Sequence, residues 1–139
     1  MLKTIIRAVL GIEGALALFV AVNIWSDPER GGAQLGVAPI GDLGLSTIRG
    51  DIGALFAGAG IFMIATAITQ DRRLIVPPLA YTVLALAART LSLALTTYSP
   101  DVIQPMTIEG ISIAILTMAY VVLGQTPATV ASRSETTGT

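Results

Sequence analysis

The chain has 139 residues, of which 53% are hydrophobic and only 12% charged, and its formal net charge is −1. Soluble domains carry about 25% charged residues, so this composition favours a membrane protein, with the lipid bilayer as its main partner. The sequence has no cysteine, no histidine and no basic cluster, which argues against disulfides, His-ligated haem, the common zinc sites and nucleic-acid binding, and we expect no metal and no cofactor.

Four apolar stretches are long enough to cross a bilayer, whose hydrocarbon core of about 30 Å needs about 20 helical residues. We predict spans over residues 4–25, 46–69, 74–97 and 105–124, which together form one transmembrane domain, 1–124. The stretch between the first two spans begins D-P-E-R-G-G and is rich in Gly and Pro, so we predict a loop there. Short turns are expected at 70–73 and 98–104. Residues 125–139 are small and polar, and we predict a disordered cytoplasmic tail.

Basic residues are distributed unevenly over the two sides that these spans define. Lys3 and Arg7 precede the first span. Arg72 and Arg73 separate the second from the third, which places them on the same side. Short cytoplasmic loops are enriched in Lys and Arg, so both termini are predicted to be cytoplasmic (N-in/C-in). The predicted fold class is therefore all-α, a polytopic membrane protein forming an antiparallel four-helix bundle.

Each predicted span has one face of small or polar residues. Small residues at helix contacts let backbones approach closely in lipid. In the second span such residues recur at spacings of three and four, at Ser46, Gly50, Gly53, Ala57, Gly60 and Ala67. The third span repeats the pattern at Thr82, Ala85, Arg89, Ser92 and Thr96, and the fourth has Glu109, Ser112 and Tyr120 on one side. These faces predict a bundle with a polar interior.

Five charged residues fall inside the predicted spans, at Glu13, Arg49, Asp51, Arg89 and Glu109. Counting about 1.5 Å per residue from the outer ends, all except Glu13 lie in the outer half of the bilayer. Arg89 and Glu109 lie at similar depths on neighbouring antiparallel helices, so we predict an ion pair, with Arg49 close enough to join. Asp51 faces away from the small residues of its span. Glu13, at mid-depth, either reaches Arg89 or carries a proton.

This charged cluster has two interpretations. A buried Arg–Glu pair can fix which helices associate and in which register. Intramembrane ionisable residues also mark functional sites, and three acids with two arginines are more than one such structural ion pair needs. On the second interpretation the ligand-binding residues are Arg49, Asp51, Arg89, Ser92 and Glu109. The candidate catalytic residues are Glu13, Arg89, Glu109 and Tyr120.

Several of these residues form short motifs: R-G-D-I-G-A-L-F-A-G from Arg49, R-T-L-S from Arg89, and the glutamate Glu109 early in the fourth span. They resemble a family of small bacterial four-helix membrane proteins catalogued only as a domain of unknown function. The resemblance covers residues 46–123 and matches the family pattern at Arg49, Gly53, Arg89, Ser92, Asp101 and Glu109. The chain departs from it at Ile52 and Ala88, where the family has glycine. It implies a bacterial inner-membrane protein and no particular activity.

Three functions fit these features. The first is binding of a lipophilic or anionic amphiphilic ligand, or service as an accessory membrane subunit, with Arg49 and Arg89 holding an anionic head group. The second is a metal-free acid–base enzyme, such as an isomerase, epoxide-opening enzyme or cyclase, acting on a lipophilic substrate. The third is a small transporter, which with four spans would work as a homo-oligomer or with another membrane protein.

Overall fold

The computed structural model describes residues 1–96 and 99–124, and every regular element in this part of the chain is a helix. In chain order the elements are α1 (Leu2–Ser26), α2 (Pro28–Gln34), α3 (Gly41–Thr47), η1 (Ile48–Gly53), α4 (Ala54–Thr69), η2 (Arg72–Ile75), α5 (Val76–Leu95), η3 (Pro100–Val102) and α6 (Ile103–Gly124). The element η1 is a π-helix that leads directly into α4, whereas η2 and η3 are short 3-10 helices.

Within the described residues, four helical stretches are long and apolar enough to cross a membrane, in agreement with the spans predicted from the sequence. They are Leu2–Ser26, Gly41–Thr69, Arg72–Leu95 and Pro100–Gly124. Each begins a few residues earlier than predicted. Large apolar side chains such as Phe19, Leu84 and Ile111 are exposed on their outer faces. The predicted tail, residues 125–139, lies outside the described part of the chain.

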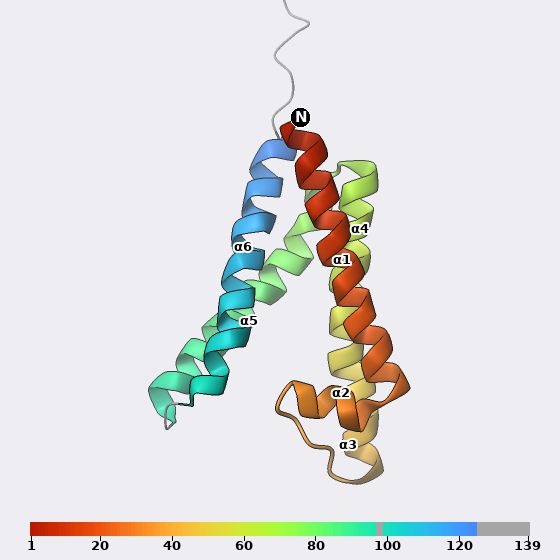
Figure 1. Cartoon of the computed structure of the whole chain (residues 1–139), viewed down its shortest axis with the longest axis vertical. Helices are drawn as coiled ribbons and strands as arrows, with labels where there is room; N and C mark the ends of the chain where they lie inside the picture. Colours follow the sequence, from red (N-terminus) through yellow and green to blue (C-terminus); the bar gives the residue numbers. More distant parts are fainter. Residues whose placement is uncertain (97–98, 125–139) are drawn as a thin grey trace, which may run out of the picture.

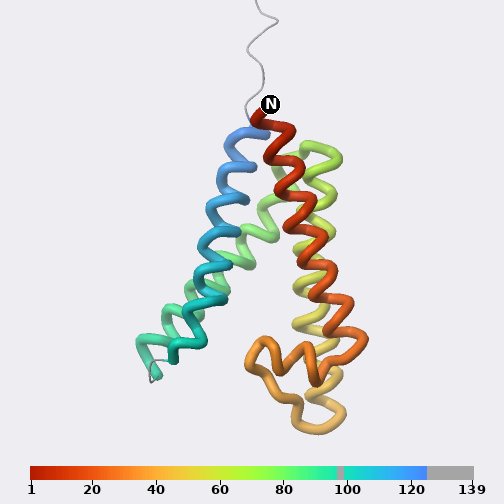
Figure 2. The backbone as a smooth tube through the Cα atoms, in the orientation of Figure 1, coloured from red at the N-terminus to blue at the C-terminus, as the bar shows by residue number. Residues whose placement is uncertain are grey.

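The four long helices form two antiparallel pairs (Figure 1). We call α1 with α4 the first helix pair, and α5 with α6 the second. The pairs meet at the end that holds the N-terminus and separate towards the other end, as the tube in Figure 2 also shows. The hydrophobic core fills the junction and contains Ile6, Leu10, Met63, Ile75, Leu116, Ala119 and Val122. The bundle therefore has a closed end and an open end.

The first helix pair is held together by backbone contact between two glycines. A Cβ atom at Gly60 would lie 2.7 Å from the carbonyl oxygen of Gly14, and one at Gly14 would lie 2.9 Å from the carbonyl oxygen of Gly60. Neither position has room for a side chain, so the two helices approach as closely as their backbones allow. Nearby, Arg7 Nε donates a hydrogen bond to the carbonyl oxygen of Ala67 at 2.7 Å, which adds a polar link between α1 and α4.

The row of small residues predicted for the second span is buried only in part. Gly53, Ala57 and Gly60 are buried, whereas Ser46 and Gly50 are exposed. The reason is η1, because a π-helix has more residues per turn than an α-helix and rotates the residues before it around the axis. Ile48 is buried in their place, with 2% of its surface exposed. A spacing argument that assumes a continuous α-helix fails at this point.

The predicted loop between the first two spans is wrong in part, because it contains the short helices α2 and α3. The start of α2 is capped by Asp27, whose side chain accepts a hydrogen bond from the backbone N–H of Arg30. Pro28 occupies the first helical turn, where its missing N–H has no cost. The following Gly31 packs against Ile24 of α1, with no room for a Cβ atom. The glycines that suggested a loop are therefore packing positions in a helix.

The predicted turn before the fourth span is likewise shorter than expected. Residues 100–102 form η3, and α6 begins at Ile103. Pro105 therefore lies within the first turn of α6, where a backbone N–H has no intrahelical acceptor and proline is tolerated. The start of the fourth span cannot be taken from the position of this proline.

Candidate functional site

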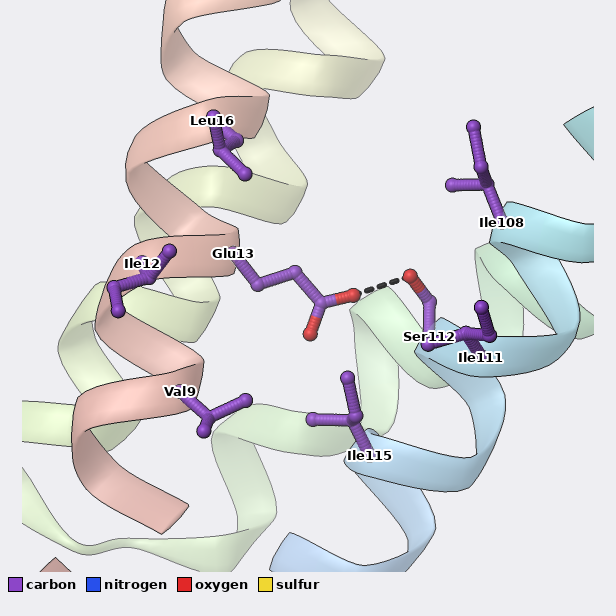
Figure 3. Close-up of a pocket in the computed structure, with 8 residues that line it drawn as sticks. All are labelled: Val9, Ile12, Glu13, Leu16, Ile108, Ile111, Ser112 and Ile115. Carbon is purple, nitrogen blue, oxygen red and sulfur yellow. Dashed lines mark hydrogen bonds between the residues drawn. The ribbon is translucent and has the colours of Figure 1, made fainter. Parts of the chain in front are cut away.

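A cleft of about 370 Å³ lies between α1 and α6 (Figure 3). Its lining consists of Val9, Ile12, Glu13, Leu16, Ile108, Ile111, Ser112 and Ile115. On both helices the lining residues fall at positions i, i+3, i+4 and i+7, with the polar residue at i+4. This spacing puts four side chains on one helix face. Because α1 and α6 run antiparallel, the two polar residues meet at the centre of the cleft.

Glu13 reaches across the cleft from α1, and Ser112 Oγ on α6 donates a hydrogen bond to its Oε1 (Figure 3). The other carboxyl oxygen, Oε2, is buried and has no hydrogen-bond partner among the described residues. In the same part of the chain no cation forms an ion pair with Glu13. A buried polar atom without a partner is energetically costly, so this oxygen is the most conspicuous unsatisfied group of the cleft.

The predicted contact between Arg89 and Glu109 is present within the second helix pair. Arg89 Nε lies 2.8 Å from Glu109 Oε1, with side-chain exposures of 37% for the arginine and 15% for the glutamate. Glu109 Oε2, like that of Glu13, is buried without a hydrogen-bond partner in the described part of the chain. Glu109 precedes Ser112 by one turn of α6, so the ion pair lies close to the cleft along that helix. The alternative in which Glu13 reaches Arg89 is wrong, because Ser112 holds Glu13 instead. The other alternative, in which Glu13 carries a proton, stays a prediction.

Arg49 does not join this ion pair, which corrects the prediction. Its Nε donates to the carbonyl oxygen of Trp25 at 3.2 Å, and the indole Nε1 of Trp25 donates to the carbonyl oxygen of Arg49 at 3.0 Å. Gly53 leaves room for the indole ring, because a Cβ atom there would lie 2.5 Å from Nε1. These contacts hold η1 against the end of α1. They belong to the first helix pair, whereas Glu109 belongs to the second, and the two pairs are separated at this end of the bundle (Figure 1).

The other candidate residues lie apart from the cleft. Asp51 is exposed in η1, on the arm of the first helix pair, and Ser92 is exposed on α5. Tyr120 lies near the closed end, where the guanidinium of Arg72 stands 5.2 Å from the centre of its ring. It is two turns of α6, about 12 Å, beyond Ser112. Of the candidate residues, the structure therefore brings Arg89 and Glu109 together. Glu13 instead meets Ser112, which was predicted only as part of the polar face of the fourth span.

A second groove, of about 630 Å³, runs along α5 and is lined by Val83, Leu86, Ala87, Thr90, Leu91, Ala94 and Ile113. It contains no charged residue. The two grooves therefore differ in one chemical respect, the carboxyl group of Glu13. Among residues 1–96 and 99–124, no group of three or more Asp or Glu side chains is placed to hold a metal ion.

The apolar walls of the cleft were not identified from the sequence. Their signal is the matched i, i+3, i+4, i+7 spacing on the first and last spans, each with one polar residue in the same place. Leu and Ile are common on lipid-facing helix surfaces, so each pattern alone is uninformative. Only the pairing of the two patterns, read in antiparallel order, would have indicated that Glu13 faces Ser112.

Fold and site together define an all-helical protein with four helices that could cross a membrane, arranged as two pairs around a largely apolar cleft. Comparisons with models of protein families, with curated proteins and with solved structures gave no match. The resemblance to a bacterial membrane-protein family therefore stays a prediction.

Proposed function

We propose that this chain is an integral protein of a bacterial inner membrane and that the cleft between α1 and α6 binds a lipophilic ligand. The observation that supports the proposal most directly is the composition of the lining, in which six aliphatic side chains surround Glu13 and Ser112. Ligand pockets are mostly apolar, have volumes of about 300–1,000 Å³, and contain a few convergent polar groups. The cleft has each of these properties.

The cleft faces the space that lipid would occupy. The side chains of Ile12 and Ile111, on its two walls, are 63% and 57% exposed. In a membrane, a ligand would enter sideways from the hydrocarbon region rather than from water. An anionic head group, one of the classes expected from the sequence, is disfavoured because the charged residue of the lining is an acid. Arg49 and Arg89 are both engaged elsewhere.

Filling the cleft with indole rings is expected to remove the ligand without unfolding the protein. We would extract wild type and the variants Ile12→Trp and Ile111→Trp in mild detergent and examine them by native mass spectrometry. The control is Ile61→Trp, at a residue of α4 that is 58% exposed and does not line the cleft. Wild type and control should retain a lipophilic small molecule that both cleft variants lose.

If all four proteins carry the same adducts, the cleft is not the binding site. A co-purifying protein in place of a small molecule would favour the accessory-subunit function instead.

The orientation that we propose, with both termini in the cytoplasm, rests on the basic residues and can be tested with single cysteines, because the chain has none of its own. Gln34→Cys lies at the end of α2, and Arg73→Cys lies in η2, at the start of the third span. Both residues are exposed. A membrane-impermeant maleimide should label the Gln34→Cys protein in intact cells and the Arg73→Cys protein only after lysis. The reverse order would invert the topology.

A further inference from the structure

The carboxyl group of Glu13 restricts the chemical class of ligand that the cleft can bind. Its Oε1 accepts the hydrogen bond of Ser112, and its Oε2 is buried without a hydrogen-bond partner among residues 1–96 and 99–124. The nearby Arg89 is paired with Glu109 and does not neutralise Glu13. An ionised carboxylate at this depth is costly unless a cation or hydrogen-bond donor meets it. The described part of the chain supplies Ser112 as donor and no cation.

The surroundings of this oxygen restrict the size of the group that can meet it. In Figure 3 the second oxygen of Glu13 is turned towards the side of Val9 and Ile115, away from Ser112. The atom is buried and has no hydrogen-bond partner among the described residues, and apart from Glu13 and Ser112 the residues that line the cleft are aliphatic. A primary ammonium is small and carries N–H donors for such an atom, whereas a trimethylammonium is bulkier and carries none. The aliphatic walls on either side suit a single hydrocarbon chain.

We propose that the ligand of the cleft is a single-chain amphiphile with a protonated primary amine, whose ammonium group donates to Glu13 Oε2 while its chain lies between α1 and α6. This inference rests on the proposed function, since it assumes that the cleft binds a lipophilic molecule. To the proposed lipophilic ligand, the inference adds a positive charge and a small size for the head group. Charge-assisted hydrogen bonds are shorter and stronger than neutral ones, so the amine contributes selectivity as well as affinity.

The test uses photoreactive probes that differ only in the head group. Full-length protein in nanodiscs of neutral phosphatidylcholine is irradiated with dodecyl diazirines that end in a primary amine, a trimethylammonium, a hydroxyl or a carboxylate. Peptide mapping then compares labelling of the cleft walls with labelling of the second groove on α5, which is apolar and lacks an acid. This internal ratio corrects for differences in how the probes partition into the lipid.

The amine probe is expected to label the cleft about tenfold more than the carboxylate or trimethylammonium probe, as a charged hydrogen bond of about 1.5 kcal/mol implies. Glu13→Gln should reduce the amine to the level of the hydroxyl probe and leave labelling of the α5 groove unchanged. Glu13→Asp, which keeps the charge on a shorter side chain, should retain part of the preference. Asp42→Asn, at an exposed acid of α3, is the control and should behave as wild type.

The outcomes separate the two proposals. Equal labelling of the cleft by all four probes, above that of the α5 groove, would keep the ligand cleft and overturn the amine. Preference for the carboxylate or the hydroxyl would also overturn it. Cleft labelling no higher than that of the α5 groove with every probe would overturn both proposals.

Discussion

Replacing Gly60 with leucine is expected to lower the free energy of unfolding by about 3 kcal/mol, at the upper end of the usual cost of overpacking. The added Cβ atom would lie 2.7 Å from the carbonyl oxygen of Gly14 and 2.8 Å from Leu18 Cγ. A backbone oxygen cannot move without moving the helix, so α1 and α4 must separate. In lipid this loss is not offset by new burial, because helix association there depends on close packing. Unfolding in mixed micelles, followed by circular dichroism, measures the effect.

The matched control for this prediction is Gly58→Leu, on the same helix and with the same change of residue. No atom lies within 4 Å of a Cβ built at Gly58. Leucine is a better helix former than glycine by roughly 1 kcal/mol, so this variant should be as stable as wild type or slightly more stable. Gly60→Ala should fall between the two. Equal stability of the Gly58→Leu and Gly60→Leu proteins would show that the contact with Gly14 does not hold the first helix pair together.

The number of long helices and their approximate positions were predictable from the sequence because they depend on local properties. Four long apolar stretches separated by polar residues leave few alternatives in lipid, where each backbone N–H and C=O must be bonded within its own helix. The short helix α2 was missed although its start, Asp27 followed by Pro28, is a recognisable N-cap. The next residues, Gly31 and Gly32, suggested a loop, and only the position of Ile24 shows that they pack.

The candidate site was predictable to the extent that it lies within one helix pair. Arg89 and Glu109 belong to consecutive spans whose connection is short, so their depths determine that they meet. The environments of Arg49 and Glu13 depend instead on how the two helix pairs are placed against each other. The pairs separate towards one end, which leaves Arg49 with Trp25 and far from Glu109. No spacing within a single span carries that information.

The ion pair within the second helix pair leads to the other large prediction. Arg89→Leu is expected to lower the free energy of unfolding by about 2 kcal/mol, less than the 3–5 kcal/mol typical of a fully buried pair, because 37% of the arginine side chain is exposed. The loss arises mainly from Glu109, which is 15% exposed and keeps one unpartnered oxygen already. Glu109→Leu alone, the second single variant, leaves Arg89 without this partner. Removing both side chains, in Arg89→Leu/Glu109→Leu, should restore most of the stability.

Arg73→Leu, at an exposed arginine outside the helix pairs, controls for the loss of a positive charge and should change the stability by less than about 0.5 kcal/mol.

Ligand retention, measured by native mass spectrometry on the same variants, then decides between the two interpretations of the charged cluster. If the ion pair is purely structural, the single variants should be unstable, the double variant should regain stability, and the ligand should be retained once stability is restored. A ligand-binding role predicts stable single variants that lose the bound molecule, and a double variant that does not regain it. Wild-type stability and wild-type retention in all three variants would contradict both, and would leave Glu13 and Ser112 as the polar groups that matter between the helix pairs.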